Sequence, residues 1–303
     1  MIVKSLIIGM EKVWRYKILE LYFAGGCNKN VEDFMFKKNC KRLFSYYRDR
    51  SSIKKYIEKG GKQIFLDSGA FSAYNSGATI NIDELCNYAN SISEYCTFIA
   101  CLDVIGDAEQ SYANYIYMRR KLKEPNKLIA CFHANEPIEY LYKYLTYVDS
   151  YGKLSNLALG GVAQLPGSSI RPFLDMCEPI CSKYPDVWIH AFGLTNFPLV
   201  ECYSFIDSID STKHIMQPIY GHLILPPKYK CISIGKNSRY KDYISTTDNK
   251  IIKSICSKIN LTIQDLIDTD WCRSIFYVEV MLEWLKKYNE KNTHITVKRR
   301  KLF

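Results

Sequence analysis

Short apolar runs alternate with longer amphipathic stretches along most of the chain. β-Branched and aromatic residues, which favour strands, are concentrated at 18–26, 63–71, 97–105, 127–134, 156–163, 186–194 and 204–212. Helix-like patterns follow at 81–95, 107–123, 136–148 and 168–184, with a short one at 197–203. Repeated strand-then-helix units predict a parallel sheet covered by helices.

The number of these units favours a closed barrel over an open sheet. Seven units are visible, and the run at 230–236 is expected to supply the eighth strand, with helices near 247–258 and 270–289 closing the ring. Residues 31–59 form a mixed segment after the first strand, and 213–245 resemble a long loop or insertion. A doubly wound sheet gives the same alternation but usually stops at about five or six strands. We therefore predict an α/β fold, a (β/α)8 TIM barrel with an irregular C-terminal helical extension.

The composition is that of a soluble globular protein. Hydrophobic residues make up 48% of the 303 positions and charged residues 24%, and no apolar stretch approaches the roughly 20 residues of a membrane span. This length suits one barrel, so we expect one domain over 1–303 with its core at about 20–289. The apolar run at 1–10 has no cleavage site behind it, so no export signal is expected.

The twelve cysteines are irregularly spaced, which predicts reduced thiols in a cytoplasm. Cys96 and Cys101 lie five positions apart and Cys177 and Cys181 four apart, so neither pair has C-x-x-C spacing. We therefore expect no structural zinc.

The net charge of +10 is unevenly distributed. Residues 37–62 contain ten Lys or Arg against Asp49 and Glu58. The tail at 291–303 is also basic, and an acid-free cluster contains Lys228, Lys230, Lys236, Arg239 and Lys241. Such surfaces suit a phosphate backbone, although a solvated, lysine-rich surface is the structural alternative.

Acidic residues end three of the apolar runs, where a parallel barrel builds its active site. Asp67 ends one run and Asp103 another, while Asp210 ends the last, three residues after Asp207. Each acid also has a purely structural explanation. Asp67 could cap the turn after its strand or the following helix, and Asp103 and Asp210 could cap the helices that follow them. Asp107 is better placed than Asp103 to cap the helix at 107–123.

Other strand ends carry residues suited to a flat ligand. Gly160 and Gly161 permit close backbone approach, although paired glycines also mark ordinary turns. His133 ends its run, and a lone histidine is more often structural. Phe192 and Gly193 end the next-to-last run.

Five strand-end segments occur in a specific order: FLDSGAF, ACLDVIGD, LALGGVA, IHAFGLT and FIDSIDST. In this order they resemble the motifs of the tRNA-guanine transglycosylase superfamily over about residues 20–215. The D-S-T at 210–212 is similar to the nucleophile motif of its compact phage branch, which inserts 7-deazaguanines such as preQ0 into DNA. The resemblance implies a glycosyltransferase, in the host cytoplasm if phage-encoded, that shields a genome from restriction enzymes.

The resemblance also implies roles for individual residues. Asp210 would be the nucleophile that attacks C1′, Asp67 the general acid/base, and Asp103 the reader of the guanine edge. Asp207 would support the site. A free 7-deazaguanine would be the co-substrate, with no metal or other cofactor. The base would lie against Ser68, Phe71, His133, Gly160, Gly161, Phe192 and Gly193.

Two departures from the RNA-modifying enzymes favour DNA as the partner. Their C-x-C-x-x-C zinc motif is absent, and STKHI at 211–215 replaces the basic motif after the nucleophile. Three alternatives stay open: a transglycosylase acting on tRNA, a glycosylase that removes a base by hydrolysis, and a non-catalytic nucleic-acid-binding barrel. The last would be expected to lose an acid, whereas Asp67, Asp103 and Asp210 are all present.

Overall fold

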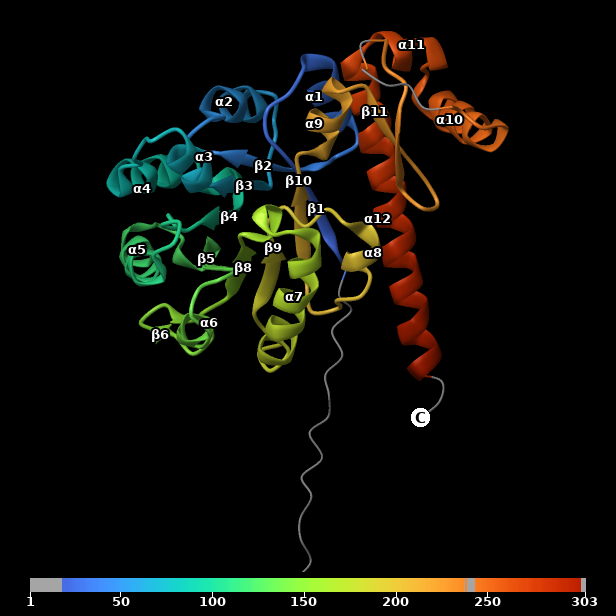
Figure 1. The fold of residues 1–303 in the computed structure, drawn as a ribbon. Coiled ribbons are helices and arrows are strands. Elements are labelled where there is room, and N and C mark those ends of the chain that lie inside the picture. Colours follow the sequence, from blue (N-terminus) through green and yellow to red (C-terminus); the bar gives the residue numbers. More distant parts are fainter. Residues whose placement is uncertain (1–17, 237, 239–242, 301–303) are drawn as a thin grey trace, which may run out of the picture.

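Eight parallel strands form a closed barrel (Figure 1). The computed structural model describes residues 18–236, 238 and 243–300, with only the backbone at 164 and 293–300. The barrel strands are β1 (Glu20–Ala24), β2 (Lys41–Ser45), β3 (Ile64–Asp67), β4 (Cys96–Ala100), β5 (Leu128–His133), β8 (Asn156–Gly160), β9 (Trp188–Ala191) and β10 (Ser208–Ser211). Their order around the ring is β1-β10-β9-β8-β5-β4-β3-β2, which confirms the predicted (β/α)8 barrel.

Helices cover the outside of this ring (Figure 1). They are α1 (Lys29–Lys37), α2 (Arg50–Glu58), α3 (Ala70–Asn75), α4 (Ile82–Ser91), α5 (Ala108–Lys121), α6 (Ile138–Leu145), α7 (Gly167–Cys181), α8 (Phe197–Val200) and α9 (Lys213–Ile219). A small hairpin, β6 (Val148–Asp149) with β7 (Gly152–Lys153), follows α6. The C-terminal extension contains β11 (His222–Leu225), β12 (Lys230–Ser233), α10 (Thr246–Ile259), α11 (Ile263–Asp268) and α12 (Asp270–Arg300).

The predicted eighth strand was wrong. The run at 230–236 contributes β12, which pairs antiparallel with β11 outside the barrel. The missing barrel strand is β2, inside the mixed segment at 31–59, where Lys41 and Arg42 obscured the apolar pattern. The stretch at 213–245 is an insertion with its own structure, since it contains α9, β11 and β12.

The two predicted C-terminal helices exist, but only one of them covers the barrel. α12 packs on α1 and α9 and so lies beside the seam between β1 and β10. α10 packs on α11, α12 and β11 at the edge of the molecule (Figure 1). Within the described part of the chain, no helix has the length and apolar character that crossing a membrane demands. All twelve cysteines lie in that part and are free thiols, as predicted.

Inward-facing side chains fill the barrel with aromatic rings. Successive strand residues point to opposite faces, so alternate positions face the axis. Phe65 lies with its ring centre 4.7 Å from that of His190 and 5.5 Å from that of Tyr22. Below the strand ends the interior is therefore packed, and a ligand can enter only at the mouth.

Arg42 on β2 is a buried charge that joins three elements. Its guanidinium donates to the carbonyls of Phe23 at 3.1 Å and Gly25 at 2.6 Å, and pairs with Glu32 of α1. Its side chain is 1% exposed, so this member of the basic stretch at 37–62 is unavailable to a polyanion. A buried charge is tolerated only with such partners.

Replacing Arg42 is expected to destabilise the protein. Arg42→Met keeps the length of the side chain but leaves Glu32 and two carbonyl groups without their donor. We expect the free energy of unfolding to fall by about 3–5 kcal/mol in urea denaturation. The control Arg48→Met, at an exposed position, should change it by less than about 0.5 kcal/mol. Equal effects of the two variants would contradict this role.

Candidate active site

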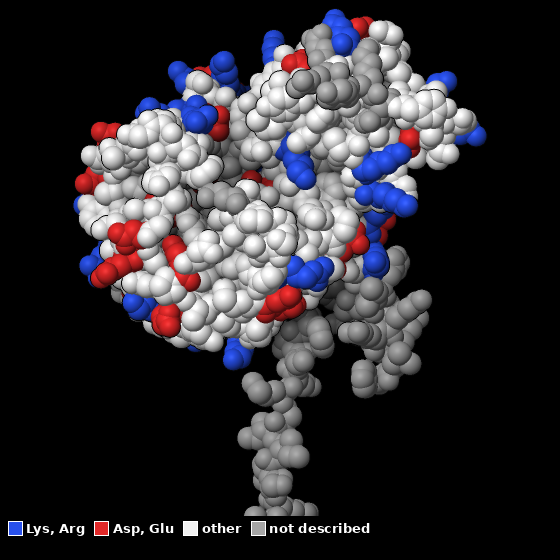
Figure 2. All heavy atoms as spheres, in the orientation of Figure 1, with Lys and Arg blue, Asp and Glu red and all other residues white. Residues whose placement is uncertain are grey.

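Polar side chains from several strands meet at the C-terminal mouth of the barrel. Asp67 ends β3, Asp103 follows β4, His133 ends β5 and Asp210 lies near the end of β10. The charges of Asp103 and Asp210 both act on Asp67, so the three acids predicted from sequence are neighbours. Figure 2 shows acidic atoms inside a hollow near the centre of the face drawn.

Asp67 is held by the turn that follows its strand. Its Oδ2 accepts a hydrogen bond from the Gly69 N–H at 3.0 Å, and Gly69 has a φ of +80°. A Cβ there would lie 2.4 Å from the Ser45 Oγ, so the turn requires glycine. Burial, then the charges of Asp103 and Asp210, raise the pKa of Asp67 from 3.8 to about 7, although the Gly69 hydrogen bond opposes the shift. Asp67 therefore forms the expected turn and is also a proton donor near neutral pH.

Asp210 is fixed through one of its two oxygens. Its Oδ1 accepts a hydrogen bond from the Gly193 N–H at 2.7 Å and lies 3.3 Å from the His190 Nε2. Gly193 has a φ of +66°, and a Cβ there would lie 2.8 Å from that of Ala163. Asp210 lies inside β10, so it is not the cap of α9, whose N-cap residue is Thr212. Both interactions use Oδ1, and no hydrogen bond to Oδ2 is found among the described residues.

A buried hydrogen-bond chain leads from Trp188 through Ser208 and His190 to Asp210. The Trp188 Nε1–H donates to the Ser208 Oγ at 3.0 Å, and this oxygen lies 2.8 Å from the His190 Nδ1. A carboxylate oxygen can only accept, so the His190 Nε2–H donates to Asp210, and in the tautomer that carries this proton Nδ1 accepts from the Ser208 hydroxyl. His190 was not predicted from the sequence. The available signal was alternation in β9, where Trp188, His190 and Phe192 share the inward face.

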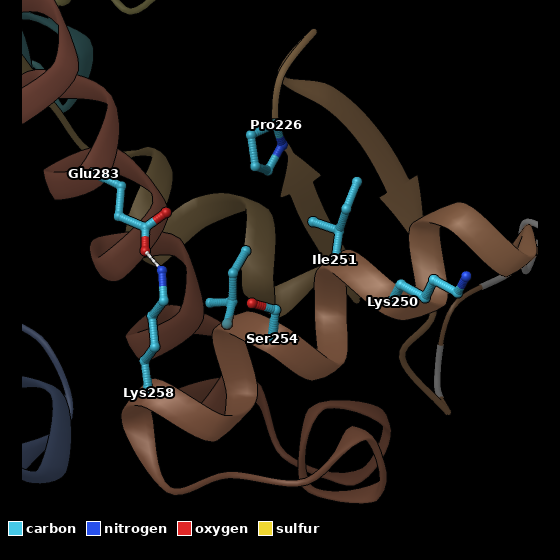
Figure 3. Close-up of a pocket in the computed structure, with 7 residues that line it drawn as sticks. Pro226, Lys250, Ile251, Ser254, Lys258 and Glu283 are labelled. Carbon is cyan, nitrogen blue, oxygen red and sulfur yellow. Dashed lines mark hydrogen bonds and ion pairs between the residues drawn. The ribbon is translucent and has the colours of Figure 1, made fainter.

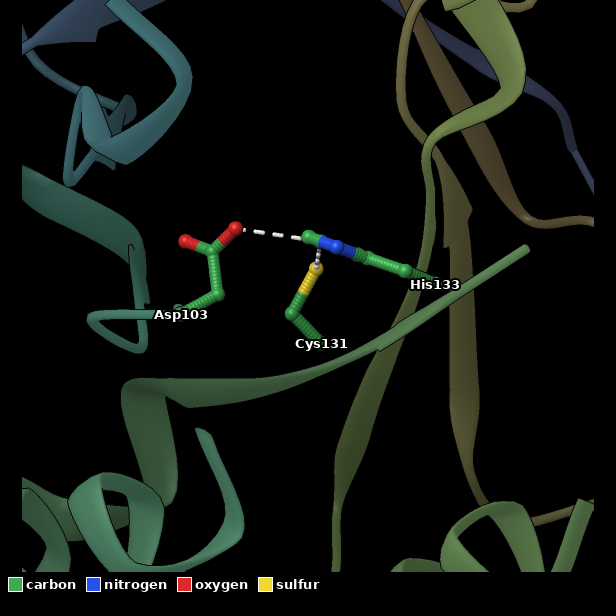
Figure 4. A group of neighbouring side chains, drawn as sticks. All are labelled: Asp103, Cys131 and His133. Atoms are coloured by element: carbon green, nitrogen blue, oxygen red, sulfur yellow. Dashed lines mark hydrogen bonds and ion pairs between the residues drawn. The ribbon is translucent and has the colours of Figure 1, made fainter. Parts of the chain in front are cut away.

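Asp103 is held by two neighbours. The Ser68 hydroxyl donates to its Oδ1 at 3.2 Å, and the His133 Nε2 lies 3.0 Å from its Oδ2 (Figure 4). Asp103 does not cap α5, because Asp107 does so by accepting from the Gln110 N–H at 2.9 Å. Its carboxylate is therefore oriented toward the mouth of the barrel.

His133 lies over Gly160 and pairs with acids on both sides. Burial lowers the pKa of His133, but the hydrogen bond and charge of Asp103, with the charge of Glu136, raise it above 6.5 overall. A Cβ at Gly160 would lie 2.0 Å from the ring, so glycine is required for this packing. The thiol of Cys131 lies 3.0 Å from the same Nε2, which makes Asp103, Cys131 and His133 a set that can hold a metal ion.

Some of the remaining predicted residues lie at the barrel mouth, and others do not. Phe192 packs with its ring centre 4.6 Å from that of His190, and Gly161 forms the turn after β8 with a φ of +76°. Phe71 is 46% exposed at the start of α3. Asp207 lies outside the group, because it precedes β10 and accepts from the Ile189 N–H at the opposite end of the strand. This hydrogen bond joins β9 to the start of β10, at the other end of the strand from Asp210.

The basic clusters are partly neutralised by acids. Lys228 is exposed, whereas Lys230 pairs with Asp248 at 2.8 Å and Lys236 with Asp268 at 3.7 Å. Arg239 and Lys241, with residues 1–17 and 301–303 of the predicted terminal segments, lie outside the described residues. Lysine and arginine side chains nevertheless gather on the upper part of the face in Figure 2, near α2, α9 and α10, while acids are more frequent near α4 to α6.

One basic residue near Asp210 was also not predicted from the sequence. Lys213 follows Asp210 by three positions, is half-buried, and donates through its Nζ to the Thr195 carbonyl at 3.3 Å. Burial lowers the pKa of Lys213 below 10.5. It is therefore a basic group close to the barrel mouth.

A pocket of about 300 Å³ lies away from this mouth (Figure 3). It is formed by α10, α12 and the strand end at Pro226, and the Lys258–Glu283 ion pair closes one side. Its lining holds no cysteine, histidine or group of acids.

A scan against models of known protein families finds no match to the chain, and a search of curated proteins finds no match either.

The raised pKa of Asp67 predicts a pH-dependent cost to folding. The unfolded chain releases this proton near pH 3.8, whereas the folded protein holds it to about pH 7, so stability falls as pH rises between these values. Asp67→Asn should raise the free energy of unfolding by roughly 1–3 kcal/mol at pH 8 and change it little at about pH 3.5. Urea denaturation at both pH values measures this, with the exposed Asp83→Asn as control. A gain that is the same at both pH values would contradict it.

Proposed function

We propose that this protein exchanges guanine in DNA for a free 7-deazaguanine base, through a covalent bond between Asp210 and the sugar. One observation carries the proposal: three carboxyl groups converge at the barrel mouth, and one of them, Asp67, keeps its proton to about pH 7. A proton donor beside a carboxylate nucleophile supplies the two groups that breaking an N-glycosidic bond requires. The order of the strand-end motifs supports the same assignment.

In the first step, Asp210 attacks C1′ of the target nucleotide. Its Oδ2 supplies the electron pair for the new C1′–O bond, while the electrons of the C1′–N bond leave with guanine. Asp67 gives its proton to the departing base, so guanine leaves neutral and Asp67 becomes a carboxylate. The Gly193 N–H and the His190 Nε2–H keep Oδ1 fixed, which orients Oδ2 for an in-line attack.

In the second step, the incoming 7-deazaguanine replaces Asp210. The Asp67 carboxylate takes the proton from the attacking nitrogen of the new base, the C1′–N bond forms, and the C1′–O bond to Asp210 breaks. Both carboxyl groups return to their starting state. Neither step consumes a cofactor, because one N-glycosidic bond is exchanged for another.

Asp103 is suited to recognise the base in both steps. Ser68 and His133 fix its carboxylate, which can accept hydrogen bonds from the N–H groups on the Watson–Crick edge of guanine. Adenine offers an acceptor at the matching ring position, so it would leave Asp103 unpaired. The ring of Phe192 and the backbone at Gly160 and Gly161 lie at neighbouring strand ends, where a flat heterocycle would be held.

The nucleic acid is expected to cross the basic side of the mouth. A target base stacked in a duplex hides C1′, so the nucleotide must be flipped or single-stranded. Lys213 lies next to the reacting sugar in this arrangement, and the exposed Lys228 lies in the extension farther from it. The absence of the C-x-C-x-x-C motif from the sequence supports DNA over tRNA as the partner.

Loss of Asp210 is expected to abolish exchange. Full-length protein is incubated with radiolabelled guanine or 7-cyano-7-deazaguanine and, separately, with DNA and unmodified tRNA. Wild type should label DNA, Asp210→Ala should lose at least about 10³-fold in rate, and Asp67→Asn about 10²–10⁴-fold. The exposed Asp83→Asn is the matched control and should keep the wild-type rate.

The other outcomes of this experiment each give a different answer. Label in tRNA alone keeps the chemistry and overturns DNA as the substrate. Release of guanine without entry of a new base indicates a hydrolytic glycosylase. No label in either nucleic acid overturns the proposal, and tight DNA binding by the inactive protein would indicate a binding barrel.

His190 is expected to act as a positioning residue for Asp210. His190→Phe keeps an aromatic ring in the barrel but removes the donor to Oδ1, so kcat should fall about 10–100-fold with KM for the free base within about twofold. His190→Gln, which keeps an N–H donor, should recover part of the rate. A rise in KM with unchanged kcat would show that His190 does not position Asp210.

A further inference from the structure

Three potential metal ligands meet on the β4–β5 side of the barrel mouth (Figure 4). The Oδ2 of Asp103, the Sγ of Cys131 and the Nε2 of His133 all lie within 4.8 Å of one another. The imidazole nitrogen is 3.0 Å from the carboxylate oxygen and 3.0 Å from the sulfur. Cys131 and His133 come from alternate positions of β5, so both side chains point inward.

The Nε2 of His133 has two close partners in this arrangement, the Asp103 carboxylate and the Cys131 thiol. An imidazole nitrogen has a single in-plane direction for a proton or a lone pair, so it can form one well-directed hydrogen bond. Two partners at 3.0 Å on the same nitrogen are better explained by a centre that all three atoms share. Zinc bonds of about 2.0–2.3 Å in a tetrahedron place ligand atoms roughly 3.3–3.8 Å apart, so small side-chain movements would accommodate the ion.

Glu136 provides an independent observation. Its side chain is 6% exposed, and its Oε1 is buried without a hydrogen-bond partner, 4.0 Å from the Nδ1 of His133. Its Oε2 accepts from the His133 backbone N–H at 2.9 Å, which holds the carboxylate beside the ring. Metal-binding histidines commonly donate their second ring N–H to a carboxylate, which leaves the other nitrogen free for the metal. Glu136 is placed for that role, with its unpartnered oxygen directed at Nδ1.

We propose that Asp103, Cys131 and His133 bind one divalent transition-metal ion of the zinc class, oriented by Glu136. Thiolate, imidazole and carboxylate are all ligands that zinc accepts, and three protein ligands leave a fourth position for water or a substrate atom. Gly160 makes the site possible, because a Cβ there would lie 2.4 Å from the Nε2 of His133.

The ion would compete with the proposed function. Coordination occupies the carboxylate of Asp103, which the exchange reaction needs for the guanine edge, so bound zinc should inhibit exchange. Metal binding itself follows from the geometry of the three ligands. Only the inhibition rests on the proposed function, and the two can therefore fail separately.

The test measures metal binding directly. Full-length protein is freed of metal with a chelator and titrated with Co²⁺ and then with Zn²⁺, with cobalt absorption as the signal. We expect one Co²⁺ per chain with a thiolate-to-cobalt charge-transfer band, and displacement of the cobalt by Zn²⁺. The band should disappear in Cys131→Ser and persist in Cys177→Ser, a matched change at a buried cysteine on α7.

A second variant removes no ligand. Glu136→Gln should weaken Zn²⁺ binding about 10–100-fold while the band in the cobalt-saturated protein remains. Circular dichroism of each variant verifies that it is folded. Absence of stoichiometric Co²⁺ binding, binding without the thiolate band, or a band that survives Cys131→Ser would each overturn the metal site. Exchange assays with and without Zn²⁺ then test the inhibition, and an inactive enzyme that still binds cobalt would overturn only the proposed function.

Discussion

Electrostatic repulsion among three carboxyl groups in one barrel mouth is the constraint on which the rest of the site depends. Asp67, Asp103 and Asp210 come from different strands, and burial leaves little water to screen their charges. The protein meets this constraint in two ways: Asp67 keeps its proton, and the other two acids receive hydrogen bonds from fixed donors. The same arrangement that is costly for folding produces an acid and two oriented carboxylates.

The donors that hold these acids depend on the packed barrel beneath them. His190 contacts Asp210 through one ring nitrogen, while its other ring nitrogen is hydrogen-bonded to Ser208, which in turn accepts from Trp188 inside the aromatic interior. Glycine at 69 and 193 lets the backbone turn so that its N–H groups face the carboxylates. The site is therefore attached to strand ends, and the packing below the three carboxyl groups holds their donors in place.

The two sides of the barrel mouth differ in charge and in the chemistry of their side chains. Basic side chains gather near α2, α9 and α10, whereas His133, Cys131 and Glu136 form a second polar group on the side of β5. Asp103 belongs to both arrangements, because it faces the mouth and also contacts His133. The two proposed sites therefore share this carboxylate.

The sequence by itself determined the barrel, most of its strands and the three acids, because an apolar run that ends in a polar residue is a local pattern. It misassigned the eighth strand, since the two basic residues that open β2 interrupt that pattern and only tertiary contacts with Phe23, Gly25 and Glu32 make Arg42 a core residue. It also placed Asp207 in the site, although a separation of three residues along a strand puts the two acids at opposite ends and on opposite faces. Only the tertiary structure decided which groups hold Asp210 and that Asp103, Cys131 and His133 converge, because those contacts join side chains on different strands and no local sequence pattern encodes them.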